Sequence, residues 1–292
     1  MNPKIMVTEK TKDYELIDSG GGEKLERYGE VIFRRPDPQA LWRKSLPIAR
    51  WDGADAVFLR EATRAEWQIR PGVSERWSME LGGIKFWIRP TAFKHTGLFP
   101  EQVGNWEWTR DVIAKRKKTG ENVRVLNLFG YTGGATLAAA SAGAEVVHVD
   151  GSKVAIGWAR DNAELSSLSD KPIRWILDDA FAFVRREIRR GKKYEGIIMD
   201  PPAFGHGPEG ESWKIEEDFV ALVDSCTQLL SDSPLFVLIN GYAAGYSSTA
   251  YENNLLPIAE KNGGEIEKGE LAIRESATGR LLPCGIFARW CK

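Results

Sequence analysis

The fold of this chain is decided by the stretch "VRVLNLFGYTGGATLAAASAGAEVVHVD", residues 123–150. An apolar run at 123–129 leads through a glycine-containing turn into an alanine-rich stretch at 134–143, and a second apolar run follows at 144–150. The two apolar runs have the length and composition of strands, and the stretch between them has the length of a helix. Strands joined in this way pair in parallel with a right-handed crossover, so the segment predicts a β-α-β unit.

The same alternation continues to the end of the chain. Further strands are expected at residues 173–177, 195–200, 234–241, 265–273 and 285–290, and helices at 153–168, 180–191, 216–230 and 251–263. Repeated β-α units place helices on both faces of a parallel sheet. The short turn between the two closing strands predicts that these two pair antiparallel. We therefore expect an α/β fold built on a Rossmann-like, seven-stranded sheet over residues 111–292.

Residues 1–110 have a different pattern. Short runs such as "GEVIFRRP" and "IKFWIRP" alternate apolar and polar residues between Gly and Pro. This alternation, with many aromatic residues, predicts a small, mainly β N-terminal domain, which is a candidate for substrate recognition. Seven of the eleven tryptophans lie here: Trp42, Trp51, Trp67, Trp77, Trp87, Trp106 and Trp108. Core packing is a more common role for such residues than stacking on bases.

Composition excludes several classes of protein. The 292 residues are 42% hydrophobic with a formal net charge of -1, so no overall field attracts nucleic acid or membrane, although a local basic patch can bind RNA. Three cysteines are too few and too scattered for a disulfide framework or a zinc site. The polar N-terminus lacks the apolar core of a signal peptide, and no segment is apolar enough to span a membrane. We expect a cytoplasmic protein with no metal and no membrane partner.

Glycines and acids follow three successive strands. Gly130 and Gly133 allow a tight turn in which a ligand can approach backbone N–H groups at a helix start, although the turn is not a GxGxxG match. Asp150 ends the second strand, where a carboxylate can accept both hydroxyls of a ribose. Its alternative role is to cap the next helix, which Ser152 can do instead. Of Asp178 and the neighbouring Asp179, we expect one to contact an adenine amino group and the other to cap a helix, with Asp179 assigned to adenine.

The fourth of these strands ends in "DPPAF", residues 200–204. Two prolines fix the backbone and leave carbonyl groups without strand partners. Asp200 and a prolyl carbonyl, from Pro201 or Pro202, are predicted to hold a planar amine, and Phe204 is placed to stack on its ring. The alternative is a rigid turn in which Asp200 only caps a helix.

Taken together, "NLFGYTGGAT", "HVDGS", "LDDAFAFV" and "IIMDPPAFG" resemble the motifs of class I S-adenosylmethionine-dependent methyltransferases. More narrowly, the chain resembles the large-subunit ribosomal RNA methyltransferases related to the cytosine-1962 and guanine-2069 enzymes. The segment "KHTGLFPEQVGNW", residues 94–106, is similar to that family's "TGxFxDQRxNR". The resemblance covers residues 94–290. It implies the methyltransferase sheet, S-adenosyl-L-methionine as cofactor and RNA, most naturally ribosomal RNA, as substrate.

The resemblance also implies the roles of individual residues. The turn from Gly130 to Gly133 would surround the methionine part of the cofactor, Asp150 would hold the ribose and Asp179 the adenine. The full expected cofactor set is Gln102, Asn127, Phe129, Gly130, Tyr131, Thr132, Gly133, Asp150, Ser152, Asp179, Ala180 and Asp200, and the expected catalytic set is Asp200, Pro201, Pro202 and Phe204. The family's Asp-Gln-Arg is replaced here by Glu101-Gln102-Val103, which removes the arginine contact. The N-terminal part also lacks a recognisable PUA or THUMP segment.

The positions of the cysteines bear on which atom of the substrate, carbon or nitrogen, receives the methyl group. Methylation of cytosine C5 needs a cysteine thiolate. In the C5 enzymes that the chain resembles, this cysteine follows the fifth strand, whereas the loop here contains Asn240, Gly241 and Tyr242. Cys284, in the turn between the closing strands, is the one remaining candidate, although a small buried hydrophobe is its more common role. Cys226 fits a helix core. Methylation of a nitrogen is therefore favoured.

Other functions stay open at this stage. A protein glutamine or a small molecule can replace RNA as the acceptor, and a nicotinamide-dependent oxidoreductase fits the glycine turn and Asp150 but not the DPPAF corner. The basic and aromatic stretch at residues 34–44 is the preferred RNA contact. The cations at residues 185–193 are better explained by the end of a helix.

Overall fold

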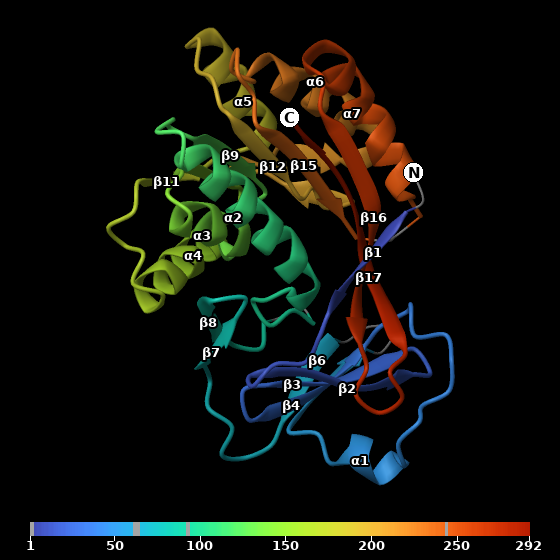
Figure 1. Cartoon of the computed structure of the whole chain (residues 1–292). Helices are drawn as coiled ribbons and strands as arrows, with labels where there is room; N and C mark the ends of the chain where they lie inside the picture. Colours follow the sequence, from blue (N-terminus) through green and yellow to red (C-terminus); the bar gives the residue numbers. More distant parts are fainter. Residues whose placement is uncertain (1–2, 61–64, 92–93, 243–244) are drawn as a thin grey trace. The chain divides into compact units, whose positions relative to one another are not determined.

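The computed structural model describes residues 3–60, 65–91, 94–242 and 245–292 (Figure 1). It contains two compact units. The large unit comprises Met1–Ile5, Asn105–Glu270 and Gly285–Lys292, and the small unit comprises Met6–Gly104 and Leu271–Cys284. Residues 271–284, which include the turn between the closing strands, thus group with the N-terminal residues.

An eight-stranded sheet forms the centre of the large unit, in the order β1-β16-β17-β15-β12-β9-β10-β11. Its strands are β1 (Lys4–Thr8), β9 (Arg124–Leu128), β10 (Glu145–Asp150), β11 (Ile173–Leu177), β12 (Gly196–Met199), β15 (Phe236–Gly241), β16 (Glu265–Arg274) and β17 (Leu281–Cys291). The run from β15 through β12, β9 and β10 to β11 is parallel, and β17 is antiparallel to β15. All seven expected strands are present, which confirms the α/β prediction, and β1 adds an eighth at one edge.

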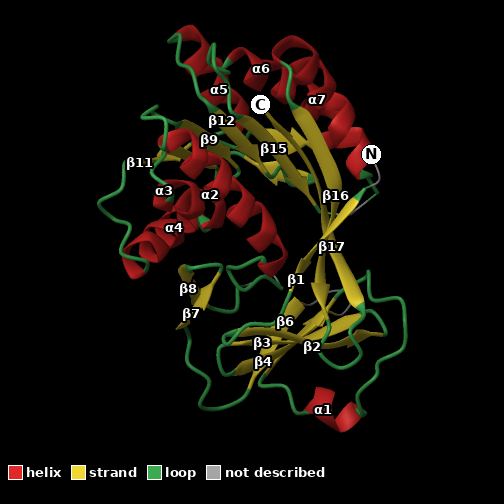
Figure 2. Cartoon of the chain, in the orientation of Figure 1, coloured by secondary structure: helices red, strands yellow, loops and turns green. Residues whose placement is uncertain are grey.

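Helices cover both faces of this sheet (Figure 2). They are α2 (Val103–Lys117), α3 (Gly134–Ser141), α4 (Lys153–Leu165), α5 (Ala180–Arg189), α6 (Ile215–Gln228) and α7 (Ser248–Asn262). α2, α3 and α4 lie on one face, and α5, α6 and α7 lie on the other. Among the described residues, no helix is long and apolar enough to cross a membrane.

Besides β1 and α2, a further part of the large unit was not expected. A short antiparallel hairpin of β13 (Phe204–His206) and β14 (Ser212–Lys214) stands between β12 and α6, where the sequence predicted only a loop. Its strands have three residues each, too few for an alternating pattern to be recognised.

The small unit contains a five-stranded sheet in the order β2-β3-β4-β5-β6 and a separate ladder of β7 with β8. These strands are β2 (Tyr14–Gly20), β3 (Glu23–Tyr28), β4 (Val31–Pro36), β5 (Ala56–Arg60), β6 (Ala65–Ile69), β7 (Trp77–Leu81) and β8 (Ile84–Ile88), with the short helices α1 (Ile48–Asp52) and η1 (Pro100–Gln102). Phe33 packs edge-on against Trp67 at 5.3 Å and stacks on Trp77 at 5.7 Å. All seven tryptophans of residues 1–110 are buried or half-buried, as core packing requires.

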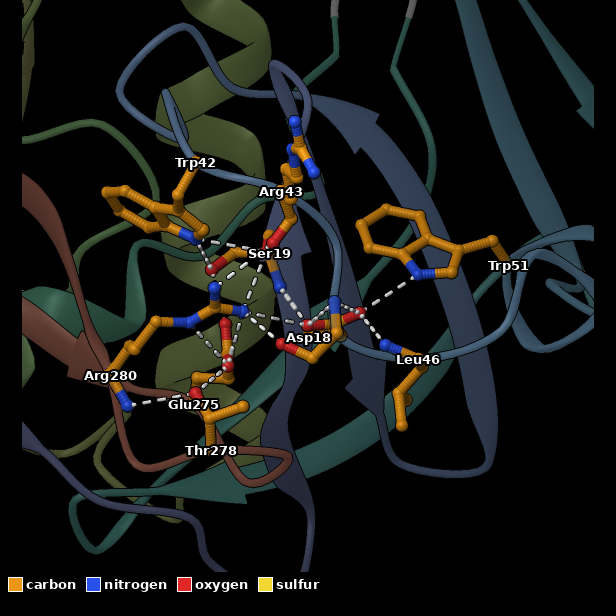
Figure 3. A network of polar contacts seen from close by, with 10 residues as sticks. Asp18, Ser19, Trp42, Arg43, Leu46, Trp51, Glu275, Thr278 and Arg280 are labelled. Atoms are coloured by element: carbon orange, nitrogen blue, oxygen red, sulfur yellow. Dashed lines mark hydrogen bonds and ion pairs between the residues drawn. The ribbon is translucent and has the colours of Figure 1, made fainter.

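A buried polar network joins residues 271–284 to the rest of the small unit (Figure 3). Asp18 is fully buried and accepts hydrogen bonds from the Leu46 backbone (2.8 Å) and the Trp51 indole (3.0 Å). The Arg280 guanidinium donates to Asp18 (3.3 Å) and to Glu275 (2.9 Å). Because buried charges are costly unless they are paired, this network holds the turn that carries Glu275 and Arg280 against β2.

Candidate active site

The polar residues that follow β9, β10 and β12 lie at one edge of the sheet. Leu128, the last residue of β9, pairs with Val149 on one side and with Met199 on the other. The residues immediately after these three positions, among them Asp150 and Asp200, therefore lie side by side. The carboxyl ends of neighbouring parallel strands are where ligands bind in this class of sheet.

The turn after β9 is conformationally strained. Phe129 (φ 57°) and Tyr131 (φ 48°) are both left-handed although neither is glycine. Gly133 (φ 92°) starts α3 in the same region, where glycine alone has no steric penalty. Left-handed non-glycine residues cost roughly 1–3 kcal/mol each, and such strain concentrates at ligand sites. The Gly130 N–H donates to the Val149 carbonyl (3.0 Å), which fixes the turn against β10.

Gly130 is required by the side chain beneath it. A Cβ at this position would overlap the imidazole of His148. His148 is fully buried, its Nδ1 lies 2.8 Å from the Thr136 hydroxyl, and burial lowers its pKa to about 3. Thr136 also accepts a hydrogen bond from the Asn127 amide (2.8 Å). The side chain of Asn127, an expected cofactor contact, is thus buried against α3, in the same interior region as the His148 ring.

Asp150 is held by two backbone groups. One carboxylate oxygen accepts the N–H of Tyr131 (2.8 Å) and the other accepts that of Ser152 (2.8 Å). Burial, as the largest cause, raises the pKa of Asp150. Each oxygen keeps one lone pair, so the carboxylate can still accept two hydroxyl groups. The cap of α4 is Ser152, whose hydroxyl accepts the Ala155 N–H (3.2 Å).

Asp178 and Asp179 have different partners. Asp178 forms an ion pair with Arg186 on α5. Asp179 is the N-cap of α5, where its Oδ1 accepts the Ala182 N–H (2.8 Å). The sequence assigned capping and adenine contact to separate residues, but the cap is Asp179 itself. One carboxylate can serve both purposes, because Oδ2 of Asp179 is not used by the cap.

The corner after β12 contains two open acceptors. Asp200 is partly buried and, within the described residues, its carboxylate accepts no hydrogen bond; burial raises its pKa to about 6. The Pro202 carbonyl accepts the Trp213 indole N–H (2.7 Å), and the Ala203 carbonyl accepts the Ile215 N–H (3.0 Å). Of the two prolyl carbonyls expected to be available, that of Pro201 accepts no hydrogen bond within the part of the chain that the structure describes. Asp200 does not cap a helix, because α6 begins at Ile215 after Lys214.

Two residues near this corner were not predicted. Trp213 is buried and its ring lies 5.1 Å from that of Phe129. Tyr251 on α7 is also buried, and a Cβ on Gly241 at the end of β15 would overlap its hydroxyl. Burial first, and then the charge of Asp200, raises the pKa of Tyr251 to about 12. Neither residue belongs to a motif, so only their contacts across the fold identify them.

The remaining candidates lie elsewhere. Gln102 ends η1 in the small unit. Cys284 is buried in the same unit, and burial raises the pKa of its thiol well above the ordinary value. A thiol in this setting is not a thiolate nucleophile. Cys226 is part of the core of the large unit, as expected.

Comparison with known proteins identifies the family. A family model described as S-adenosylmethionine-dependent methyltransferase matches residues 34–255, more than half of the chain. The chain belongs to this methyltransferase family. The crystal structure of the S-adenosylmethionine-dependent methyltransferase from Agrobacterium tumefaciens is 41% identical, with a TM-score of 0.93 over 99% of this chain and 93% of that one.

Two curated relatives are named for ribosomal RNA. "Ribosomal RNA large subunit methyltransferase K/L" of Shewanella baltica is 35% identical over 160 residues, 54% of this chain and 21% of its own length. "Ribosomal RNA large subunit methyltransferase K" of Neisseria meningitidis is 31% identical over 163 residues, 54% of this chain and 43% of its own length. This methyltransferase therefore spans less than half of these two relatives.

S-adenosylmethionine is the cofactor of the family, and the strand ends fit it. The methyltransferase offers a carboxylate with spare lone pairs at Asp150, a second acceptor at Asp179, and a tight turn at Gly130 without a side chain. These groups match the ribose, the adenine and the amino-acid part of such a molecule.

Proposed function

We propose that this chain transfers the methyl group of S-adenosylmethionine to a nitrogen of a base in RNA. The observation that supports this acceptor is the corner after β12, where the Asp200 carboxylate and the Pro201 carbonyl are both without hydrogen-bond partners among the described residues. An amino group on a planar ring has two N–H donors, which match these two acceptors.

The cofactor residues are proposed from the same edge of the sheet. Asp150 accepts the ribose hydroxyls, Asp179 accepts the adenine amino group, and the backbone N–H of Ala180 in the first turn of α5 is a further donor. The turn residues Phe129, Gly130, Tyr131, Thr132 and Gly133 surround the methionine part, and Ser152 completes the set within the large unit. When bound, the cofactor supplies an electrophilic methyl group on a positively charged sulfur.

The protein itself contributes positioning. Asp200, with a pKa near 6, is ionised at neutral pH and accepts an N–H of the amine. With the second N–H on the Pro201 carbonyl, the nitrogen lone pair is left directed away from both acceptors. Orientation of this kind accelerates transfer without a strong base, because the extra proton leaves after the methyl group has arrived.

RNA as the acceptor, ribosomal RNA in particular, is proposed because both curated relatives are named as ribosomal RNA methyltransferases. We assign substrate recognition to residues 1–110 and methyl transfer to residues 111–292, in the cytoplasm. The stretch at residues 34–44 is a weaker candidate for contact than the sequence suggested, since Arg34 and Lys44 pair with Glu23 and Arg35 pairs with Glu26.

Two experiments test this function. Calorimetry should detect S-adenosylhomocysteine binding and no NAD binding, and the reverse result would contradict the cofactor. Mass spectrometry of RNA nucleosides from cells with and without the gene should show the loss of one N-methylated base. An unchanged nucleoside profile would exclude RNA as the substrate. Methylation of a protein glutamine or of a small molecule would then be tested with the same enzyme. Loss of 5-methylcytosine would contradict transfer to nitrogen.

A further inference from the structure

Hairpin β13–β14 has two different faces. Gly205 pairs with Trp213, whose side chain is buried in the core. Phe204 and His206 flank Gly205 on β13 and therefore point to the opposite face, because side chains alternate along a strand. Both are exposed, Phe204 by 55%. The hairpin thus holds two rings in solvent while its other face is anchored.

The exposed rings of Phe204 and His206 lie close together and nearly perpendicular to each other. Their centroids are 4.9 Å apart and their planes meet at 86°. The Phe204 ring offers an apolar face for stacking, and the His206 imidazole, set nearly perpendicular to it, offers ring nitrogens that donate or accept hydrogen bonds. A planar ring that stacks on Phe204 would therefore lie next to His206.

Hairpin β13–β14 contacts residues next to the proposed binding positions of the substrate amine and the cofactor. Trp213 binds the carbonyl of Pro202, two residues before Phe204. At the other end, a Cβ on Gly151 would lie 3.1 Å from the His206 carbonyl oxygen, and a Cβ on Gly207 would lie 3.1 Å from the Cβ of Asp179. The two rings are thus held between the corner after Asp200 and the strand ends that carry Gly151 and Asp179.

The side chains around the exposed face of hairpin β13–β14 are mostly acidic, which disfavours contact with RNA phosphates. The hairpin turn carries Glu209 and Glu211, and the first turn of α6 carries Glu216, Glu217 and Asp218. Lys214, opposite Phe204, is paired with Glu217 (2.8 Å). An RNA backbone would be repelled here, whereas an uncharged base would not.

We propose that Phe204 and His206 form the recognition surface for a single unstacked base of the RNA substrate, with Phe204 as the stacking platform and His206 as the residue that distinguishes the edge of the base. The proposal rests on the proposed function for the nature of the substrate. In this proposal, His206 determines which base is bound. The hairpin contacts only the base, and the RNA phosphates are contacted by other parts of the protein.

Nuclear magnetic resonance of the full chain with S-adenosylhomocysteine tests this surface directly. The chain has three histidines. Burial and nearby cations lower the pKa of His95 to about 4, and burial lowers that of His148 to about 3, so both stay neutral from pH 6 to 8. Adenosine, guanosine, cytidine and uridine are added separately as probes that lack phosphate. We expect one of them to move the His206 signals, assigned with His206→Gln, and the movement to disappear in Phe204→Ala and persist in Phe204→Tyr.

Methylation of total RNA from cells lacking the gene supplies the second measurement. Phe204→Ala should raise the KM for RNA roughly 5- to 100-fold, as loss of base stacking does. His206→Ala should raise KM with little change in its salt dependence, because no phosphate contact is lost. The control is Val220→Ala on α6, which removes a side chain that is 60% exposed and should leave KM unchanged.

Two results would overturn the proposal: no nucleoside moves the His206 signals, or both Phe204→Ala and His206→Ala methylate RNA with the wild-type KM. Either result obtained with an enzyme that methylates RNA refutes only this surface. Failure of the wild-type enzyme to methylate RNA at all refutes the proposed function instead.

Discussion

The Trp213 indole N–H donates a 2.7 Å hydrogen bond to the carbonyl oxygen of Pro202. This bond joins β14 to the corner after β12 and leaves the neighbouring Pro201 carbonyl as the open acceptor beside Asp200. The position of the acceptor site therefore depends on a residue 13 positions after Asp200 in the sequence.

Trp213→Phe should lower kcat for RNA methylation several-fold and the free energy of unfolding by about 1 kcal/mol, the contribution of one hydrogen bond. Affinity for S-adenosylhomocysteine should be unchanged. Trp290→Phe is the matched control, because it removes the hydrogen bond from the buried Trp290 indole to the Gly263 carbonyl (2.8 Å), far along the chain from the corner. It should cost similar stability and leave kcat intact, and equal kcat losses in the two variants would contradict a specific role of Trp213.

Asp200→Asn should abolish turnover and change S-adenosylhomocysteine affinity by less than about tenfold, or 1.4 kcal/mol. It should also stabilise the fold. Burial raises the pKa of Asp200 from 3.8 to about 6, so the folded wild type loses stability as pH rises across this range. Urea unfolding at pH 7.5 should show the variant more stable by up to about 3 kcal/mol, with the difference disappearing below pH 3.8, the ordinary pKa of the group. A variant that retains full activity would refute the acceptor role.

A plot of kcat/KM against pH should fall on the acidic side of about pH 6. Protonated Asp200 cannot accept the amine N–H, and its raised pKa places protonation near 6 rather than 4, so activity falls as pH drops through 6. Tyr251, with a pKa near 12, stays neutral throughout. Rate measurements from pH 5 to 9 with stable enzyme check this, and a profile flat down to pH 5 would be inconsistent with an ionised Asp200.

Gly130→Ala should weaken S-adenosylhomocysteine binding at least tenfold, because the new methyl group displaces the turn from the His148 ring. Removing the ring should restore part of the affinity, so the double variant Gly130→Ala/His148→Ser should show a coupling of about 1 kcal/mol or more by calorimetry. Gly157→Ala is the control, since nothing lies within 4 Å of its Cβ position. Strictly additive effects would show that the ring does not support the turn.

Arg280→Met should lower the free energy of unfolding by about 1–3 kcal/mol, because it leaves the buried carboxylates of Asp18 and Glu275 without their cation. Arg274→Met on β16 is the comparison, since its pair with Glu9 is exposed and should be worth less than about 1 kcal/mol. Urea denaturation of both variants measures the difference. Equal losses would mean that the network in Figure 3 is no more stabilising than a surface pair.

Much of the large unit is predictable from local sequence. The strand and helix order, the turn at Gly130 and Gly133, and the acids after β10, β11 and β12 all follow from periodicity and turn chemistry within short windows. The same windows predicted core packing for the tryptophans of residues 1–110, of which Trp51 and Trp106 are buried and the other five are half-buried. Hairpin β13–β14 was missed because each strand is only three residues long.

Finer assignments depended on partners distant in sequence. Arg186 on α5 pairs with Asp178 and leaves Asp179 as the cap, and Trp213 selects between two adjacent prolyl carbonyls. His148, rather than turn chemistry alone, requires the glycine at 130. The turn that carries Arg280 is held by Asp18, more than 250 residues earlier in the chain.

The sequence alone determined most of the strands and helices of the large unit and which end of its sheet carries the polar groups, because backbone preference and side-chain alternation act over a few residues. Only the tertiary structure decided which carboxylate and which carbonyl remain free to bind a ligand. That choice depends on which hydrogen bonds are already made, and each of those bonds is formed by a side chain that the fold brings from elsewhere.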